Sequence, residues 1–147
     1  MLLFLIILIS GIVIDIYTKY LAVAIFKVNE IEVIKNILYF TYVENRGAAF
    51  GILQNQKWLL VVFTLIIMIF IIIYLIIKKP DNKILISSLS LILSGGIGNL
   101  IDRINYSYVI DFIDVRIINY PVFNIADCLV VCGSILLCVY ILFFYEN

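Results

Sequence analysis

Four long apolar stretches set the fold class of this chain. They cover approximately residues 2–26, 58–77, 84–101 and 117–145. A helix that spans a bilayer needs about 20 predominantly apolar residues, so each stretch is long enough to cross a membrane. Hydrophobic residues make up 65% of the chain and charged residues 14%, whereas soluble domains are about 45–50% apolar and about 25% charged. The sequence therefore predicts a multi-pass, all-α membrane protein whose residues 1–147 form one domain.

The connections between these stretches indicate how the chain is oriented. Three Lys lie in the short hairpin of residues 78–83, which is therefore expected in the cytoplasm. Both termini then lie in the cytoplasm as well, and residues 27–57 and 102–116 lie on the outer side. We expect the first stretch to be a retained helix rather than a cleaved leader, because no basic residue precedes it and Asp15 and Lys19 interrupt it.

The first outer connection has the composition of a β-sheet. Ile31–Ile34 and Ile37–Val43 are rich in β-branched and aromatic residues, and Asn36 between them is a typical turn residue. We expect a small sheet over about residues 30–51 that lies on the outer membrane surface. A strand edge there is able to pair with an extended peptide. The alternative is a plain surface hairpin.

Composition also excludes several classes of chemistry. The chain has no His, which removes imidazole as a base or metal ligand and removes His-dependent serine and cysteine catalysis. Its 10 basic and 10 acidic side chains balance, so the charge gives no sign of a nucleic-acid partner. Cys128, Cys132 and Cys138 lie in the last apolar stretch, where we expect buried packing residues rather than disulfides. We therefore expect no metal and no cofactor.

The strongest indication of function is a carboxylate at membrane depth. Asp127 is the only charged side chain between Ile117 and Tyr145, and inserting such a group costs about 2.5–3.5 kcal/mol, so a functional role is the default. Asp111 lies just before the same stretch, so the two carboxyl groups are able to meet at one membrane face. Opposed carboxyl groups share one proton; the ionised member activates water and the protonated member supplies a proton. We therefore predict Asp111 and Asp127 as a catalytic pair.

Other charged residues have candidate partners nearby in the sequence. Asp15 and Lys19 are one helical turn apart and are expected to form an ion pair. Asp114 is expected to be solvated or paired with Arg116. We expect Pro121 in the first turn of the last helix, a position that suits proline.

Two further groups of polar residues follow helical spacing. Asn99, Asp102 and Arg103 come after a Gly-rich segment and are expected to project from one helix face. Asp102 is expected to have a structural role, for example as a cap with Arg103. Asn124 and Asp127 are three residues apart, so they are also expected to share a face.

Five short motifs occur together in the order found in one protein family. They are DIYTK (15–19), NRGAAF (45–50), GGIGNLIDR (95–103), VIDFI (109–113) and FNIAD (123–127). By these motifs the chain resembles the lipoprotein signal peptidases, the type II signal peptidases of bacteria, which are aspartyl proteases of the plasma membrane. The resemblance spans almost the whole chain. The few departures, such as Cys128 where Ser is common, do not touch the predicted pair.

The resemblance implies a fold of four helices with an outer β-cradle and a short outer helix between the third and fourth helices. It implies an intramembrane endopeptidase that removes the signal peptide from diacylglyceryl-modified prolipoproteins, cutting just before the lipidated Cys. The enzyme is expected to act as a monomer in the bacterial plasma membrane, with its active site near the outer face and without a metal. Globomycin-type cyclic peptides are expected to inhibit it.

The resemblance also assigns roles to residues. It makes Asp111 and Asp127 the catalytic pair. The expected substrate-binding residues are Asn45, Gly47, Asn99, Arg103 and Asn124. The expected supporting residues are Asp15, Lys19 and Asp102.

Two other functions are compatible with charged residues inside a membrane. The first is a small ion-coupled transporter, with Asp15, Lys19 and Asp127 as a relay. Such a relay needs polar positions along several helices, whereas the stretch 58–77 has no charge. The second is a membrane scaffold without catalysis, in which the pair of aspartates is dispensable.

Overall fold

Four long helices dominate the fold. The computed structural model describes residues 2–48, 52–118 and 120–144. The helices are α1 (Leu2–Leu21, continued by a π-helical segment at Ala22–Phe26), α2 (Lys57–Lys78), α3 (Lys83–Tyr106) and α4 (Ile125–Phe143). All four are long and apolar enough to cross a membrane. The predicted four-helix membrane architecture is therefore confirmed.

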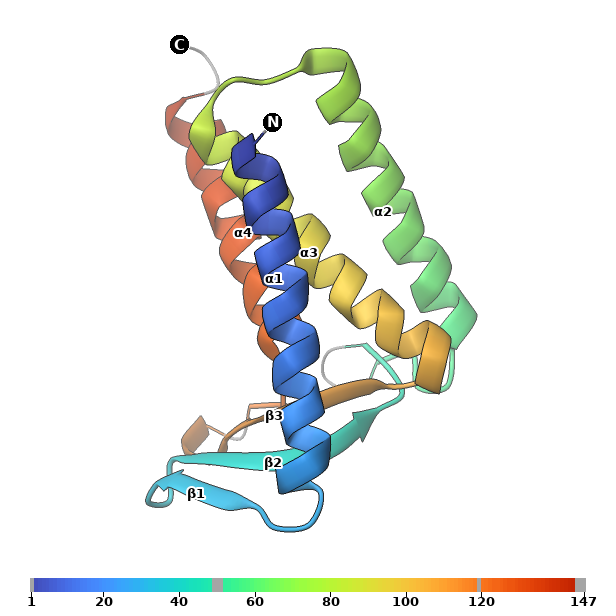
Figure 1. Cartoon of the computed structure of the whole chain (residues 1–147), viewed down its shortest axis with the longest axis vertical. Helices are drawn as coiled ribbons and strands as arrows, with labels where there is room; N and C mark the ends of the chain where they lie inside the picture. The colour runs from blue at the N-terminus through green and yellow to red at the C-terminus, as the bar shows by residue number, and fades with distance from the viewer. Residues whose placement is uncertain (1, 49–51, 119, 145–147) are drawn as a thin grey trace.

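Helix α3 is the centre of the bundle. It packs against each of the other three helices, and α1 also contacts α4. Figure 1 shows α1, α3 and α4 together, with α2 approaching α3 near the sheet end. The other helices expose large apolar side chains, such as Phe70 at 76% and Leu142 at 75%. Such extended apolar surface is typical of contact with lipid.

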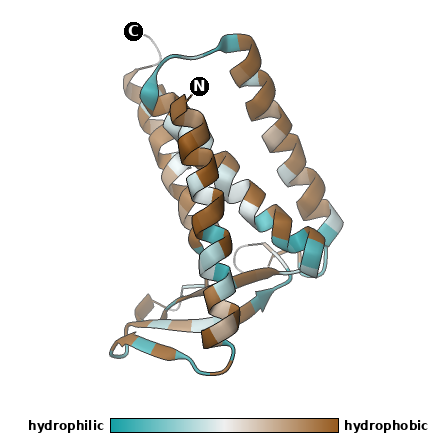
Figure 2. Cartoon of the chain, in the orientation of Figure 1, coloured by the Kyte–Doolittle hydropathy of each residue, from teal (hydrophilic) through white to brown (hydrophobic). Residues whose placement is uncertain are grey.

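Polar residues are concentrated at the two ends of the bundle. Figure 2 shows hydrophilic positions on α1 and α3 close to the sheet, and in the connection between α2 and α3 at the opposite end. The start of α1 and the end of α4 lie at that opposite end too (Figure 1). The sheet and the polar part of α1 and α3 therefore share one end of the molecule.

The third helix is longer than its apolar stretch. It continues beyond residue 101 to Tyr106, because Asp102 and Arg103 find polar partners inside the protein. Ser107 follows with a left-handed backbone (φ 69°) and ends the helix. The Gly-rich part of α3 allows close packing: a Cβ on Gly95 would overlap the carbonyl oxygen of Ala126 in α4.

The predicted start of the fourth helix is wrong. The helix begins at Ile125 instead of residue 117, because Asn124 caps it through a reciprocal pair of hydrogen bonds with Asp127. Arg116–Ile118 form a single turn of 3-10 helix, which corresponds to the expected short outer helix. Residues 119 and 145, also within the predicted range, lie outside the described residues.

The segment before α4 is extended. Phe123 forms an isolated antiparallel bridge with Ile113, and its N–H donates to the Ile113 carbonyl at 3.1 Å. Pro121 consequently precedes the helix and does not occupy its first turn, contrary to the expectation. The capping residue rather than the proline decides where α4 begins.

The sheet is larger than predicted. β1 (Ile31–Ile34) and β2 (Leu38–Asn45) follow the expected hairpin, with Asn36 in a left-handed turn conformation (φ 57°). A third antiparallel strand, β3 (Val109–Val115), comes from the connection between α3 and α4, and the strand order is β1-β2-β3. Its aspartates lower the β-propensity of this stretch, which is why composition did not reveal it.

A β-bulge in β2 decides which side chains face Asp111. The register shifts by one residue between Phe40 and Val43, so Val43 is paired with Asp111. In a regular ladder Tyr42 would occupy that place. The bulge also brings Asn45, two positions after Val43, to the same face as Asp111.

Aromatic rings fasten the sheet to the end of α1. Phe26 lies in the π-helical segment, 5.3 Å from Phe40 and 6.2 Å from Phe112 between ring centroids. The buried Ala22 and Ile110 complete this cluster. It holds β3, and with it Asp111, against the helices.

The cysteines form no disulfide, as expected, but they are less buried than expected. All three are free; Cys128 is partly buried, whereas Cys132 and Cys138 are exposed on α4. A membrane helix can present a thiol to lipid at little cost, because a free thiol behaves as a small apolar group. Within the described residues no group of His, Cys, Asp or Glu is arranged to hold a metal ion.

Candidate active site

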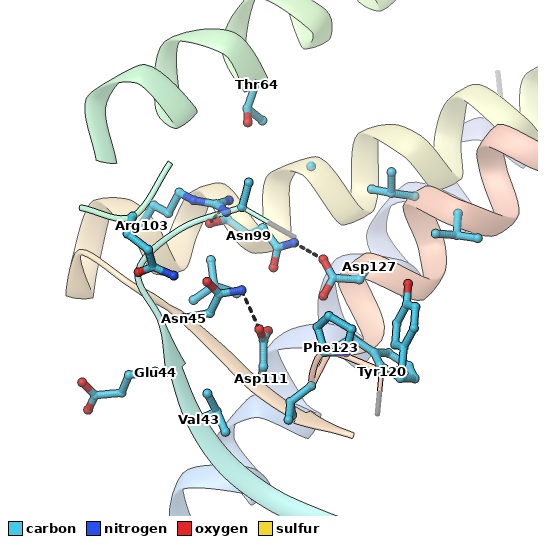
Figure 3. A pocket seen from close by; sticks show the side chains of 18 residues that line it. Val43, Glu44, Asn45, Thr64, Asn99, Arg103, Asp111, Tyr120, Phe123 and Asp127 are labelled. Carbon is cyan, nitrogen blue, oxygen red and sulfur yellow. Dashed lines mark hydrogen bonds between the residues drawn. The ribbon is translucent and has the colours of Figure 1, made fainter. Parts of the chain in front are cut away.

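A cavity of about 520 Å³ lies where α3, α4 and the sheet meet. Its walls come from the end of β2 and the loop after it, one side of α3, residues 120–123 and the first turns of α4. Asp111 and Asp127 both line it. Figure 3 shows the two carboxyl groups directed into the same space from β3 and α4.

Asp111 is buried on β3, with 1% of its surface exposed. Its Oδ2 accepts a hydrogen bond from Asn45 Nδ2 at 2.9 Å, and its Oδ1 accepts one from Asn124 Nδ2 at 2.6 Å. Figure 3 shows the first of these contacts, which depends on the bulge in β2. The carboxyl group is thus held on both sides by amides.

Asp127 sits in the first turn of α4. Its Oδ2 accepts the backbone N–H of Asn124 at 3.1 Å, and its Oδ1 accepts Asn99 Nδ2 at 2.8 Å. The N-terminus of a helix favours negative charge, because unpaired N–H groups and the helix dipole point towards it. The Asp127 carboxyl group is therefore held at the positive end of the α4 dipole.

The amides around the pair have fixed orientations. Asn45 Oδ1 and Asn124 Oδ1 each accept a backbone N–H, at 3.0 Å and 2.9 Å. Asn99 Oδ1 accepts a hydrogen bond from the ammonium group of Lys19 at 3.0 Å. Since an N–H group can only donate, each amide oxygen must face its donor, and each NH₂ group must face a carboxylate. All four oxygens of the two carboxyl groups therefore accept a hydrogen bond from nitrogen.

A buried ion cluster lies next to the pair. Lys19 is 3% exposed, and its Nζ lies 2.8 Å from Asp15 Oδ2 and 3.0 Å from Asp102 Oδ2. The predicted pair of Asp15 and Lys19 is confirmed. The suggested cap between Asp102 and Arg103 is replaced by the contact with Lys19, which comes from a different helix.

Arg103 lines the cavity from α3. Its guanidinium donates to the carbonyl of Gly47 at 3.2 Å, which links α3 to the loop after β2. A guanidinium has five N–H donors, so several remain for a ligand in the cavity. Motif residues 49–50 and Gly51 lie outside the described residues.

Burial raises the pKa of the Asp111 carboxyl to about 7, and the negative charge of Asp127 adds to this rise. Hydrogen bonds from Asn45 and Asn124 and the charge of Lys19 act in the opposite direction. Desolvation disfavours the charged form of an acid, so Asp111 tends to keep a proton at neutral pH. The pair thus contains one carboxyl group that is suited to remain protonated.

Most of the predicted site residues converge. The predicted residues that line the cavity are Asn45, Asn99, Arg103, Asp111 and Asp127. Asn124 is fully buried behind the two carboxyl groups and bonds to both of them, so it holds the pair from behind. Asp114 points away and pairs with Arg116 at 2.7 Å, as expected.

Sequence reasoning missed several residues of the cavity. These are Val43, Glu44, Gln54, Thr64, Gly96, Tyr120, Val122, Phe123, Val130 and Val131. Gly96 and Phe123 lie within two of the motifs but were not assigned to the site, whereas the others carry no motif and reach the cavity only through the fold. Many of them are apolar, so the cavity combines a polar floor with apolar walls.

A family model described as Signal peptidase (SPase) II matches residues 7–143. The chain belongs to the signal peptidase II family. This membership confirms the resemblance carried by the five motifs and makes the chain a membrane peptidase. The alternatives of an ion-coupled transporter and a scaffold are therefore not supported.

Individual members of the signal peptidase II family match over most of their length. The lipoprotein signal peptidase of Clostridium novyi (strain NT) is 49% identical over 140 residues, which cover 92% of this chain and 95% of that protein. The lipoprotein signal peptidase of Clostridium tetani (strain Massachusetts / E88) is 48% identical over 141 residues, which cover 93% of this chain and 90% of that protein.

Solved structures agree with the signal peptidase II fold. A bacterial membrane enzyme determined by the in meso method at 2.3 Å is 34% identical, with a TM-score of 0.88 over 95% of this chain and 87% of that chain. A second bacterial membrane enzyme, determined by the same method at 1.9 Å, is also 34% identical, with a TM-score of 0.85 over 96% of this chain and 93% of that chain. Four helices and a small sheet are thus the architecture of a known membrane enzyme.

Proposed function

We propose that the chain is an intramembrane aspartyl endopeptidase that removes the signal peptide from diacylglyceryl-modified prolipoproteins, cutting just before the lipidated Cys. One observation carries this proposal: Asp111 and Asp127 are directed into one cavity and are linked through Asn124. The name of the relatives, lipoprotein signal peptidase, supports the substrate class. We also propose that the enzyme acts as a monomer.

The proposed reaction needs one water molecule between the two carboxyl groups. Asp127, as the general base, takes a proton from water as the water oxygen bonds to the scissile carbonyl carbon. Asp111, protonated, gives its proton to the carbonyl oxygen. The C–N bond then breaks as the proton held by Asp127 passes to the leaving nitrogen, and one hydroxyl of the tetrahedral intermediate gives its proton to Asp111 as the new carboxyl group forms. The pair thereby returns to its singly protonated state.

The cavity walls suit a peptide in an extended conformation. Arg103 and the amides around the pair offer donors to peptide carbonyls. Val130 and Val131 on α4 offer apolar surface to the signal peptide and to acyl chains that enter from lipid. This division of polar floor and apolar wall matches a substrate that is partly peptide and partly lipid.

The charge distribution supports a site at the outer membrane face. The Lys-rich connection between α2 and α3 lies at the end of the bundle opposite the sheet (Figure 1). Positive connections favour the cytoplasm, so we propose that this end and both termini are cytoplasmic. The sheet and the cavity then lie near the outer face of the bacterial plasma membrane.

A cleavage assay tests the proposed function. The purified chain is incubated with a diacylglyceryl-modified prolipoprotein and with the same protein lacking the lipid, and the products are identified by mass spectrometry. We expect a single cut before the lipidated Cys, only in the modified substrate, and inhibition by a globomycin-type cyclic peptide. Equal cleavage of both substrates, or of neither, would contradict the proposal.

The pH dependence of cleavage is a separate prediction. Because the pKa of Asp111 is raised to about 7, its proton is present below that pH and is lost above it, so kcat/KM should fall as the pH rises through about 7. Asn45→Ala removes a hydrogen bond that lowers this pKa, so the decrease in kcat/KM should occur at a higher pH in this variant. Asn36→Gly, in the turn between β1 and β2, serves as the control and should leave the pH of this decrease unchanged.

A further inference from the structure

The ion cluster of Asp15, Lys19 and Asp102 reaches both members of the pair. Asp15 Oδ1 accepts the backbone N–H of Ala126 at 2.8 Å, and Asp102 Oδ2 accepts the backbone N–H of Ile110 at 3.1 Å. Ala126 immediately precedes Asp127, and Ile110 immediately precedes Asp111. The two cluster carboxylates therefore hold the chain one residue before each proposed catalytic carboxyl group.

Lys19 makes a third connection, through Asn99. Three oxygens lie within 3.0 Å of its ammonium, one each from Asp15, Asp102 and Asn99, and only the contact with Asn99 is a hydrogen bond. The contact with Asn99 Oδ1 is 3.0 Å long, and on the other side of the amide Asn99 Nδ2 donates to Asp127 Oδ1 at 2.8 Å. A reversed amide would place an oxygen against the Asp127 carboxylate, and the ammonium opposes that reversal.

One other group also favours this orientation of Asn99. Asn124 Nδ2 lies 3.2 Å from Asn99 Oδ1, but the same nitrogen is 2.6 Å from Asp111 Oδ1 and 3.3 Å from the Ile110 carbonyl. Its two hydrogens are shared among three acceptors, whereas Lys19 directs a full positive charge at the Asn99 oxygen. Lys19 is therefore the stronger determinant.

We infer that Lys19, held by Asp15 and Asp102, is a positioning residue for peptide cleavage: it fixes the Asn99 amide as a donor to Asp127. Lys19 does not touch the reacting atoms and acts through Asn99, whereas Asp15 and Asp102 hold Lys19 and bind the backbone before each aspartate. This inference rests on the proposed cleavage activity. The competing view is that the cluster only fastens α1 to α3.

A double-mutant cycle separates the two views. Lys19→Met, Asn99→Leu and the double variant are compared with the wild type in the full-length protein, using a diacylglyceryl-modified prolipoprotein. We expect each single variant to lower kcat by roughly 10²-fold, the scale of a small misplacement of a catalytic group, with KM within about threefold. If Lys19 acts through Asn99, the double variant is no slower than Asn99→Leu alone. Multiplying losses, or an unchanged kcat in Lys19→Met, would overturn the inference.

Removal of Lys19 alone leaves two buried carboxylates without their cation, which destabilises a protein strongly. The variant Asp15→Asn/Lys19→Met/Asp102→Asn removes all three charges together and keeps an oxygen acceptor for each backbone N–H. We expect it to fold, as measured by circular dichroism and thermal unfolding, and to show the same loss of kcat with little change in KM. Wild-type kcat in this variant would overturn the inference, as would failure of both variants to fold. If the wild type itself does not cleave, the proposed function fails instead.

Discussion

Asp111→Asn and Asp127→Asn are each expected to abolish cleavage while the protein remains folded. Each substitution keeps the size of the side chain but removes a group that exchanges protons with water or with the scissile amide. General acid–base catalysis contributes about 10²–10⁴-fold, and loss of one member also removes the shared proton, so we expect a decrease in kcat of at least about 10³-fold. The measurement is single-turnover cleavage of a diacylglyceryl-modified prolipoprotein by the purified variants.

Asp114→Asn provides the matched control for this prediction. Asp114 lies on the same strand as Asp111, but it pairs with Arg116 outside the cavity. It should keep cleavage within about threefold of the wild type, because an exposed ion pair contributes little. Thermal unfolding of all three variants should remain cooperative. If Asp111→Asn or Asp127→Asn cleaved the substrate at a rate close to that of Asp114→Asn, the assignment of the catalytic pair would be refuted.

Gly95→Ala is expected to have the largest effect on stability. A Cβ at this position would overlap the Ala126 carbonyl oxygen, which belongs to the backbone and cannot rotate away. Helix α4 must then move from α3, and we expect a loss of about 3 kcal/mol, the upper part of the range for overpacked sites. Because Ala126 precedes Asp127, we also expect cleavage by the remaining folded protein to fall by roughly 10²-fold.

The neighbouring glycine is the control. A Cβ on Gly96 would meet its nearest atom, Thr64 Cγ2, at 3.7 Å, which is an ordinary contact. Gly96→Ala should therefore unfold at nearly the same temperature as the wild type in the same detergent. Equal destabilisation by the two substitutions would mean that the loss does not come from the close approach of α3 to α4, because Ala has the higher helix propensity at both positions.

The helices and the two aspartates of the proposed catalytic pair were predictable because local features of the sequence mark them. The length of each apolar stretch gives the spans, and Asp127 is conspicuous as a charge within such a stretch. The beginning of α4 after Asn124 was missed, because the long apolar stretch obscured the local signal of a reciprocal cap. The same cap holds Asp127, so the error at the helix boundary coincides with the site.

Contacts between distant segments were not predictable from composition or spacing. Strand β3 pairs with β2 across more than 60 positions, and the bulge that brings Asn45 to Asp111 is visible only in the register of that pairing. Asp102 was matched with its neighbour Arg103, whereas its partner is Lys19 on another helix. Spacing in the sequence predicts only ion pairs between residues that are close along the chain. In a bundle, a buried cation can pair with carboxylates from several helices.

Hydrolysis in ¹⁸O-labelled water with enzyme in excess over substrate tests the central claim most directly. If Asp111 and Asp127 activate a single water molecule, one ¹⁸O atom appears in the new carboxylate of the released signal peptide. No peptide becomes covalently attached to the enzyme, and the variant Asp111→Asn/Asp127→Asn gives no product. Capture of a covalent peptide–enzyme intermediate, or labelled product from that double variant, would contradict the account.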